Sequence, residues 1–409
     1  MPAKTNSSPN GEKSEYYKKL SKEIWNDIPN PIEEKMFPIN DVPKPKEFND
    51  LLKLSKNYLK SLRTSPKETQ HRLGEYNPKP FGEKRTYKQQ WAEYDLAKTN
   101  EDIIFKKMLQ EILLLSIEED NYPKVGRKGY SIKEKLFAMC IKIYYRSDLR
   151  KCQSILKELK NLNYINRVPC FKSIDNFFND ERLSKILDDL ILISALPLAD
   201  LEETGAIDST GFSVSRFDRW VNYKWGTGEG KERVWRKAHA VCGCKSNIFL
   251  SVAVTEKNVG DITMLEEVVG NRTKYFKMDS FVADKAYSGR RVLKFLNELG
   301  LNPYIPFKKN VGGKSMGCMI WSQMFQFFKY CNNEFLRRYH ARSNIESSFH
   351  MVKKRFGDHL LTKNLSANVN EIKVKFLCHN LCCLIVESFE SGISLDFENC
   401  VKTISSCKN

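Results

Sequence analysis

The chain has 409 residues, and its 67 Lys and Arg outnumber its 50 Asp and Glu, which gives a formal net charge of +17. No apolar run approaches the roughly 18 residues that cross a bilayer, and the N-terminus lacks a hydrophobic signal region, so we expect neither a membrane protein nor a secreted one. Twelve Cys without a leader predict reduced thiols in a cytosol-like compartment and not a disulfide framework. The basic balance favours a polyanionic partner.

Residues 1–95 are polar, punctuated by Pro and rich in Lys, Asn and Glu. Short apolar groups, such as Ile24 with Trp25, could form one or two helices but could not supply a core. We therefore interpret this part of the chain as an extension that is partly disordered in isolation. Its residues indicate no function.

From about residue 101 the apolar spacing becomes that of helices, and we expect a helical domain over residues 96–200. The expected helices cover residues 101–119, 131–145, 149–162, 170–179 and 181–194. Short helices separated by tight breaks, with basic residues such as Arg150 and Lys172, are typical of a helix-turn-helix module that binds DNA. A helical domain that only packs against its neighbours fits the same pattern, because such modules have no sharp sequence code.

Residues 201–390 differ in character, because short apolar runs typical of strands appear among the helical patterns. The expected strands cover residues 205–215, 233–244, 247–255, 280–283 and 302–307, and the expected helices cover 261–269, 290–299 and 371–389. Three antiparallel strands followed by alternating helix and strand predict an α/β domain on a mixed sheet. Residues 391–409 are interpreted as a tail.

The segment 339–357, YHARSNIESSFHMVKKRFG, contains strong helix formers and no Pro, and it predicts one helix. At roughly 100° per residue two stripes form on this helix. The apolar stripe comprises Ile345, Phe349, Val352 and Phe356. The polar stripe comprises Tyr339, Arg342, Glu346 and Lys353. Glu346 is a lone carboxylate among cations on the polar stripe. An amphipathic surface helix with an ordinary Glu would have the same periodicity.

Two Asp residues stand at strands upstream of this segment. Asp208 lies inside the apolar run AIDSTG, where a charge without a partner would be costly. Asp284 lies at the carboxyl end of its strand, in VADKAYSG, where α/β sheets place ligands. Taken alone, each could be a strand-end Asp that caps a turn.

The order and spacing of Tyr339, Arg342, Glu346 and Lys353, with gaps of two, three and six residues, resembles the Tyr-Arg-Glu-Lys signature of insertion-sequence transposases of the DDE type. The resemblance covers about residues 205–387. It implies an RNase H-like catalytic domain, a mixed sheet with flanking helices, preceded by an all-helical, helix-turn-helix-like domain that recognises the ends of the mobile element.

The resemblance also implies roles for individual residues. Asp208, Asp284 and Glu346 become catalytic ligands of two Mg²⁺ ions, with Mn²⁺ as a possible substitute, because hard oxygen donors can hold such a pair about 4 Å apart. Arg342 and Lys353 would bind phosphates near the cut, and Tyr339 would contact the DNA end. His239, in RKAHAV, and Asp261, in NVGDITML, resemble positions found near this site, as the printed sequence shows.

The function expected from this resemblance is that of a transposase. The protein would bind the terminal inverted repeats of its own element, cleave DNA and join the 3′ ends to target DNA. We expect a homodimer in the active complex. We also expect the protein to be cytoplasmic and associated with the nucleoid of a prokaryote. A domesticated DNA-binding protein on the same fold and an RNase H-class nuclease without strand transfer are the alternatives. The glycine-rich loop 226–230 could contact DNA or could be a plain connection.

Overall fold

A computed structural model describes residues 90–117, 129–214, 235–393 and 395–406, all within the structural unit Pro43–Asn409. Most of the predicted extension of residues 1–95 and the glycine-rich loop 226–230 therefore lie outside the described residues. Among the described residues, no helix combines the length and the apolar character that a membrane span requires.

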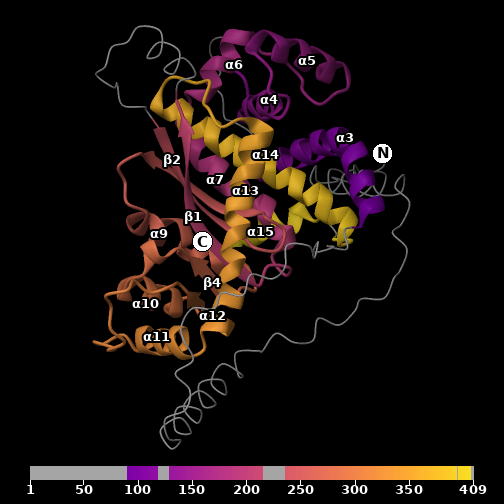
Figure 1. The fold of residues 1–409 in the computed structure, drawn as a ribbon. Helices are drawn as coiled ribbons and strands as arrows, with labels where there is room; N and C mark the ends of the chain where they lie inside the picture. The colour runs from indigo at the N-terminus through magenta and orange to yellow at the C-terminus, as the bar shows by residue number, and fades with distance from the viewer. Residues whose placement is uncertain (1–89, 118–128, 215–234, 394, 407–409) are drawn as a thin grey trace, which may run out of the picture. The chain divides into compact units, whose positions relative to one another are not determined.

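A five-stranded sheet forms the centre of the fold (Figure 1). Its strands are β1 (Thr204–Ser213), β2 (Trp235–Gly243), β3 (Phe249–Glu256), β4 (Ser280–Ala283) and β5 (Asn302–Tyr304), in the order β3-β2-β1-β4-β5. The β1–β2 and β2–β3 pairs are antiparallel, whereas β1–β4 and β4–β5 are parallel. The predicted mixed α/β class is confirmed, and this sheet is consistent with an RNase H-like domain.

The central strand β1 is longer than its parallel neighbour. Ala206, Ile207 and Phe212 are fully buried in it, as expected of apolar residues on a strand covered by helices. Strand β4 pairs only with the first part of β1, and the last pair joins Ile207 to Ala283. From Asp208 to Phe212, the edge of β1 that would face β4 has no strand partner among the described residues, and Ser213 then forms a parallel bridge with His359.

A buried carboxylate fixes the turn between β2 and β3. Glu202 is fully buried, and its carboxylate accepts hydrogen bonds from the backbone N–H of Lys245 and of Ser246, at 3.0 and 2.7 Å. The Ser246 hydroxyl donates to the same carboxylate. A Cβ on Gly243 would lie 2.2 Å from Glu202 Cδ, so only glycine allows this close approach.

The helices before the sheet agree with the predicted pattern within a few residues, except at the start of α3, which lies inside the predicted extension. They are α3 (Trp91–Ser116), α4 (Ile132–Tyr144), α5 (Leu149–Asn161), α6 (Phe171–Phe178) and α7 (Arg182–Ala195), followed by the short turn η1 (Leu196–Leu198). Ser131 caps α4, and a reciprocal bond from its backbone N–H to Glu134 completes a capping box. The α3 helix begins ahead of its expected start.

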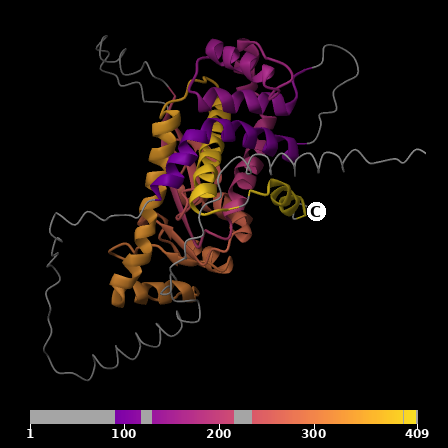
Figure 2. The same ribbon diagram turned by 90° about the vertical axis from the view of Figure 1, so that its right-hand side faces the viewer.

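The long helix α14 (Leu365–Glu390) joins these helices to the sheet. It packs against α3, α4 and α7 and also against β3. Figure 2 shows it running beside the N-terminal helices. The expected tail contains a further helix, α15 (Phe397–Ser406), which contacts α3 and α7. Helices from both ends of the described chain therefore share one core.

The remaining helices follow the sheet strands. They are α9 (Asp261–Val269), η2 (Gly270–Tyr275), η3 (Lys285–Tyr287), α10 (Arg290–Glu298), α11 (Met319–Tyr330), α12 (Asn332–Tyr339), η4 (His340–Arg342) and α13 (Ser343–Phe356). The segment 339–356 is therefore helical as predicted, but the 3₁₀ turn η4 interrupts the single α-helix that we expected. The chain tightens to a 3₁₀ turn at η4, where the Ser343 hydroxyl donates to the His340 carbonyl. The buried Phe335 anchors α12 just before this turn.

Candidate active site

The sheet register brings Asp208 and Asp284 to matching positions on neighbouring parallel strands. Each follows directly after the last β1–β4 pair, Ile207 with Ala283. Asp208 Oδ1 accepts from the Ser209 N–H at 2.8 Å, and Asp284 Oδ1 accepts from the Lys285 N–H at 2.6 Å. Asp284 thus caps the turn η3 through Oδ1, and its Oδ2 takes no part in this capping bond.

Arg342 links Asp208 to Glu346. Its Nη1 lies 3.0 Å from Asp208 Oδ2, and its Nη2 lies 2.5 Å from Glu346 Oε1. The side chains of Asp208 and Arg342 are 23% and 21% exposed, whereas that of Glu346 is 56% exposed. The Asp208 carboxylate in β1 is therefore paired with the guanidinium of Arg342 in η4, which also binds Glu346 of α13.

Burial and neighbouring charges act against each other at Asp208. Burial raises the pKa of Asp208, the Ser209 N–H and the Arg342 charge lower it, and Asp261 and Glu346 raise it further, so that the net pKa lies above its ordinary value. Burial lowers the pKa of Arg342, but its bond to Glu346 and the charges around it outweigh this effect and raise the pKa. The site is thus a crowded group of carboxylates balanced by one cation.

The other two residues of the signature flank this group. Tyr339 ends α12 and stacks on Phe335, with ring centroids 6.4 Å apart, and burial raises its pKa. Lys353 Nζ lies 5.4 Å from the centroid of the Phe212 ring, and burial lowers its pKa. The nearby Arg342 partly offsets this rise at Tyr339, whereas Lys353 lies beside the far end of β1.

The predicted DNA-binding residues Arg150 and Lys172 lie on helices α5 and α6, which contact each other. Both side chains are exposed. The Arg150 guanidinium lies 4.8 Å from the centroid of the exposed Phe171 ring, and Lys172 pairs with Asp175 at 2.9 Å. The structure thus places these two cations on adjacent helices, apart from the three carboxylates.

A second polar group lies on β2 and at the start of α9. His239 is fully buried, and its Nδ1 lies 3.2 Å from Asp261 Oδ1 without hydrogen-bond geometry. Lys237 Nζ lies 2.8 Å from the same oxygen. The sequence resemblance suggested His239 and Asp261 but missed Lys237, although it precedes His239 by two residues and so shares its face of the strand.

Tyr287 is a further residue that the sequence reasoning missed. It is 1% exposed, and its hydroxyl has no hydrogen-bond partner among the described residues. Burial raises its pKa, and the charges of Asp261, Asp208 and Asp284 raise it further. The position of Tyr287 three residues after Asp284 is a signal that could have indicated its proximity to the site.

The carboxylates of Asp208, Asp284 and Glu346 supply only oxygen ligands, which are the ligands that hard divalent cations prefer. Within the described ranges, no group of three or more His, Cys, Asp or Glu side chains has the arrangement that holds a metal ion. The guanidinium of Arg342 stands between Asp208 and Glu346. Metal binding at these residues therefore requires Arg342 to release at least one carboxylate.

An ion pair ties the helix of Glu346 to the N-terminal helices. Arg355 of α13 binds the buried Glu101 of α3 through two contacts, one of them 3.1 Å from Nη1 to Oε2. The Tyr144 hydroxyl donates to the same carboxylate at 3.2 Å. Because breaking a buried ion pair is costly, this contact fixes α13 relative to α3 and α4.

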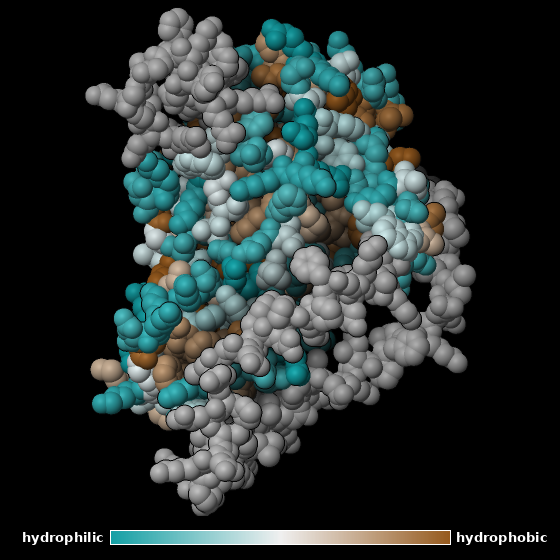
Figure 3. Space-filling model, in the orientation of Figure 1, coloured by the Kyte–Doolittle hydropathy of each residue, from teal (hydrophilic) through white to brown (hydrophobic). Residues whose placement is uncertain are grey.

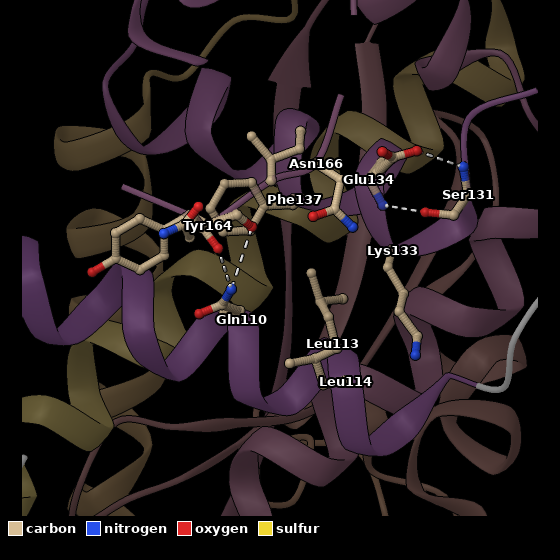
Figure 4. Close-up of a pocket in the computed structure, with 11 residues that line it drawn as sticks. Gln110, Leu113, Leu114, Ser131, Lys133, Glu134, Phe137, Tyr164 and Asn166 are labelled. Atoms are coloured by element: carbon tan, nitrogen blue, oxygen red, sulfur yellow. Dashed lines mark hydrogen bonds between the residues drawn. The ribbon is translucent and has the colours of Figure 1, made fainter. Parts of the chain in front are cut away.

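A pocket of about 250 Å³ lies elsewhere, between α3, α4 and residues 163–166 (Figure 4). Gln110 closes one side by donating to the carbonyls of Asn163 and Tyr164. None of the three carboxylates lines it. On the face shown in Figure 3, hydrophilic residues predominate, and a smaller hydrophobic area lies around α10–α12, where Met316 and Met319 are exposed.

A mixed five-stranded sheet with aspartates at matching positions of β1 and β4 is consistent with an RNase H-like domain. Residues 200–381 match the family model described as a transposase DDE domain. The match begins just before β1, ends within α14 and includes Asp208, Asp284 and Glu346. The chain therefore carries a transposase DDE domain, and the resemblance to DDE-type transposases is confirmed. No curated protein and no solved structure matches the chain at a significant level.

Proposed function

We propose that the protein is an active transposase that binds the terminal inverted repeats of its own element, cleaves DNA at them and joins the 3′ ends to target DNA. Two observations support this proposal: the β1–β4 register sets Asp208 and Asp284 at matching positions, and Arg342 binds both Asp208 and Glu346. These residues come from two strands and a helix within the transposase DDE domain.

In this proposal Asp208, Asp284 and Glu346 hold two divalent cations. Mg²⁺, or Mn²⁺ in its place, would supply activation of the attacking hydroxyl and stabilisation of the leaving oxygen. The chain itself binds and orients the DNA. Arg342 and Lys353 bind DNA phosphates on either side of the cleavage site, because their charges lie before and after Glu346 along the same segment.

Recognition of the ends is assigned to the helices before the sheet. The exposed Arg150 and Lys172 on the contacting helices α5 and α6 support this part of the proposal, as does the net charge of +17. Tyr339 is assigned to the DNA end, where its half-buried ring could stack on a displaced base. Two copies of the chain are expected to act in one complex, each on one end of the element.

The test begins with the DNA that flanks the coding region, because a pair of inverted repeats there defines the substrate. The purified full-length chain is then incubated with Mg²⁺ and a plasmid that carries both repeats. Cleavage at the repeats followed by joining of 3′ ends to a target plasmid supports the proposal. Cleavage without joining would instead identify a nuclease, and binding without cleavage would identify a DNA-binding protein that has lost its chemistry.

A further inference from the structure

The polar group of Lys237, His239 and Asp261 lies on the face of the sheet that α9 covers. Successive residues of a strand point to opposite faces, so Lys237 and His239 share one face of β2. Ser209 of β1 is the direct cross-strand partner of His239 and therefore lies on that same face. Asp208 precedes Ser209 and pairs with Ala240, so its side chain points to the other face.

Ser209 contacts an aspartate on each side of β1. Its backbone N–H donates to Asp208 Oδ1 at 2.8 Å, and its side chain lies opposite His239, on the face where Asp261 lies, and helps to lower the pKa of Asp261. Burial raises the pKa of Asp261, but the contacts of Lys237 and Ser209 and the nearby charges lower it overall. Asp261 is thus held as a carboxylate directly behind Asp208.

Two facts indicate that this arrangement is built for a purpose beyond packing. Burying a His, a Lys and an Asp in contact is costly, and here one Asp261 oxygen lies 2.8 Å from the Lys237 ammonium and 3.2 Å from Nδ1 of the buried His239. The buried hydroxyl of Tyr287, without a hydrogen-bond partner among the described residues, also lies within the field of Asp261, Asp208 and Asp284. Asp261 therefore belongs to the same cluster as the candidate metal ligands.

We propose that Asp261, held by Lys237 and His239, is a positioning residue that acts through Ser209 to orient the Asp208 carboxylate for metal binding. This inference rests on the proposed function, since it takes Asp208 as a metal ligand. Partners that orient a metal ligand typically change metal affinity by about 10- to 100-fold when they are removed. The same range is expected here.

The experiment titrates the full-length protein with Mn²⁺ and follows the EPR signal of the free ion. Asp261→Asn keeps the shape of the side chain but removes the charge that holds Lys237 and His239, and it should weaken Mn²⁺ binding about 10-fold or more. Asp261→Glu, which keeps the charge, should recover part of this loss. Asp200→Asn is the matched control, because Asp200 pairs with Lys277 on the surface and should bind Mn²⁺ as the parent protein does.

Two further readouts separate positioning from a loss of structure. The affinity for terminal-repeat DNA should stay within about twofold of the parent, and high Mg²⁺ should restore cleavage by Asp261→Asn but not by Asp208→Asn, in keeping with a 10- to 100-fold affinity loss. If Asp261→Asn does not fold, Ser209→Ala decides, because it removes only the hydroxyl link to Asp261. Parent-like Mn²⁺ binding by Ser209→Ala or by a folded Asp261→Asn overturns the inference. Parent-like binding by Asp208→Asn would instead refute the metal site itself.

Discussion

Arg342 lies 3.0 Å from Asp208, a residue 134 positions earlier in the chain. The same guanidinium holds Glu346, one helical turn further on. Two of the three proposed metal ligands are therefore neutralised by one cation that also belongs to the Tyr-Arg-Glu-Lys signature. DNA phosphates are alternative partners for a guanidinium, so DNA binding and release of the carboxylates are expected to be linked.

Arg342→Ala should act in opposite directions on metal binding and on cleavage. Without DNA, Mn²⁺ should bind more tightly, because Asp208 and Glu346 lose a competing cation. Cleavage should fall on the order of 10²-fold, because the phosphate is no longer positioned. EPR titration and a labelled-duplex assay measure the two effects, with the exposed Arg337 changed to Ala as control. Weaker Mn²⁺ binding in Arg342→Ala would show that Arg342 supports the metal site and does not compete with it.

Asp208→Asn, Asp284→Asn and Glu346→Gln should each abolish strand cleavage and leave binding of the terminal repeats nearly intact. An amide keeps the size of the carboxylate but removes the charge that a divalent cation requires. Gel shifts and cleavage of the same labelled duplex measure both activities. Glu334→Gln is the control, since Glu334 binds Arg337 and Arg338 on the neighbouring helix. Near-parental cleavage by any one of the three variants would exclude that residue as a ligand.

Lys353→Ala should retain slow cleavage that added Mg²⁺ does not restore. Its ammonium group lies over the Phe212 ring and not among the carboxylates, so its loss removes positioning of the phosphate and leaves the ligands in place. The cleavage rate at several Mg²⁺ concentrations checks this. Lys354→Ala, one residue further along the same helix, serves as the matched control. A rate that recovers fully at high Mg²⁺ would assign Lys353 to metal binding.

Arg150→Ala and Lys172→Ala in the full-length chain should weaken binding to terminal-repeat DNA. Each lost phosphate contact should reduce the slope of log affinity against log salt by about one unit. Competition gel shifts between 50 and 200 mM salt, roughly the range over which such contacts weaken binding strongly, measure the slope. Lys277→Ala, which removes an exposed cation paired with Asp200, is the control. Unchanged slopes in both variants would place end recognition elsewhere.

Glu111 should make stability depend on pH. Burial raises its pKa to about 7 from an ordinary 4.5, and the charge of Asp396 adds to this. Because the folded state binds this proton more tightly, the contribution is fully present below pH 4.5 and is lost as pH rises through 7. In the parent protein, the free energy of unfolding should fall by on the order of 1–3 kcal/mol as pH rises across this range. Glu111→Gln should not show this fall. Urea unfolding at several pH values checks this, and the exposed Glu267→Gln is the control. Identical pH profiles for parent and Glu111→Gln would contradict the expectation.

The sequence alone determined the local elements and the chemistry that they carry. Strand β4 and helix α9 have the expected bounds, because an apolar run ending in Asp284 and a helical segment between two glycines are local patterns. The spacing of Arg342 and Glu346 likewise brought them together, since residues four apart on a helical segment are neighbours. The signature and the two strand-borne aspartates were sufficient to predict the family.

The tertiary structure alone decided which of these elements meet. Only sheet pairing places Asp208 at the position that matches Asp284, and only the packing of η4 against β1 brings Arg342 onto Asp208. The link from Asp261 through Ser209 depends on the β1–β2 register in the same way. The helix α14 shows the same limit, because its contacts with α3, α4 and α7 join segments from distant parts of the chain. The periodicity of a sequence shows which face of a helix or strand is apolar. The element that packs against that face depends on the packing of the whole core.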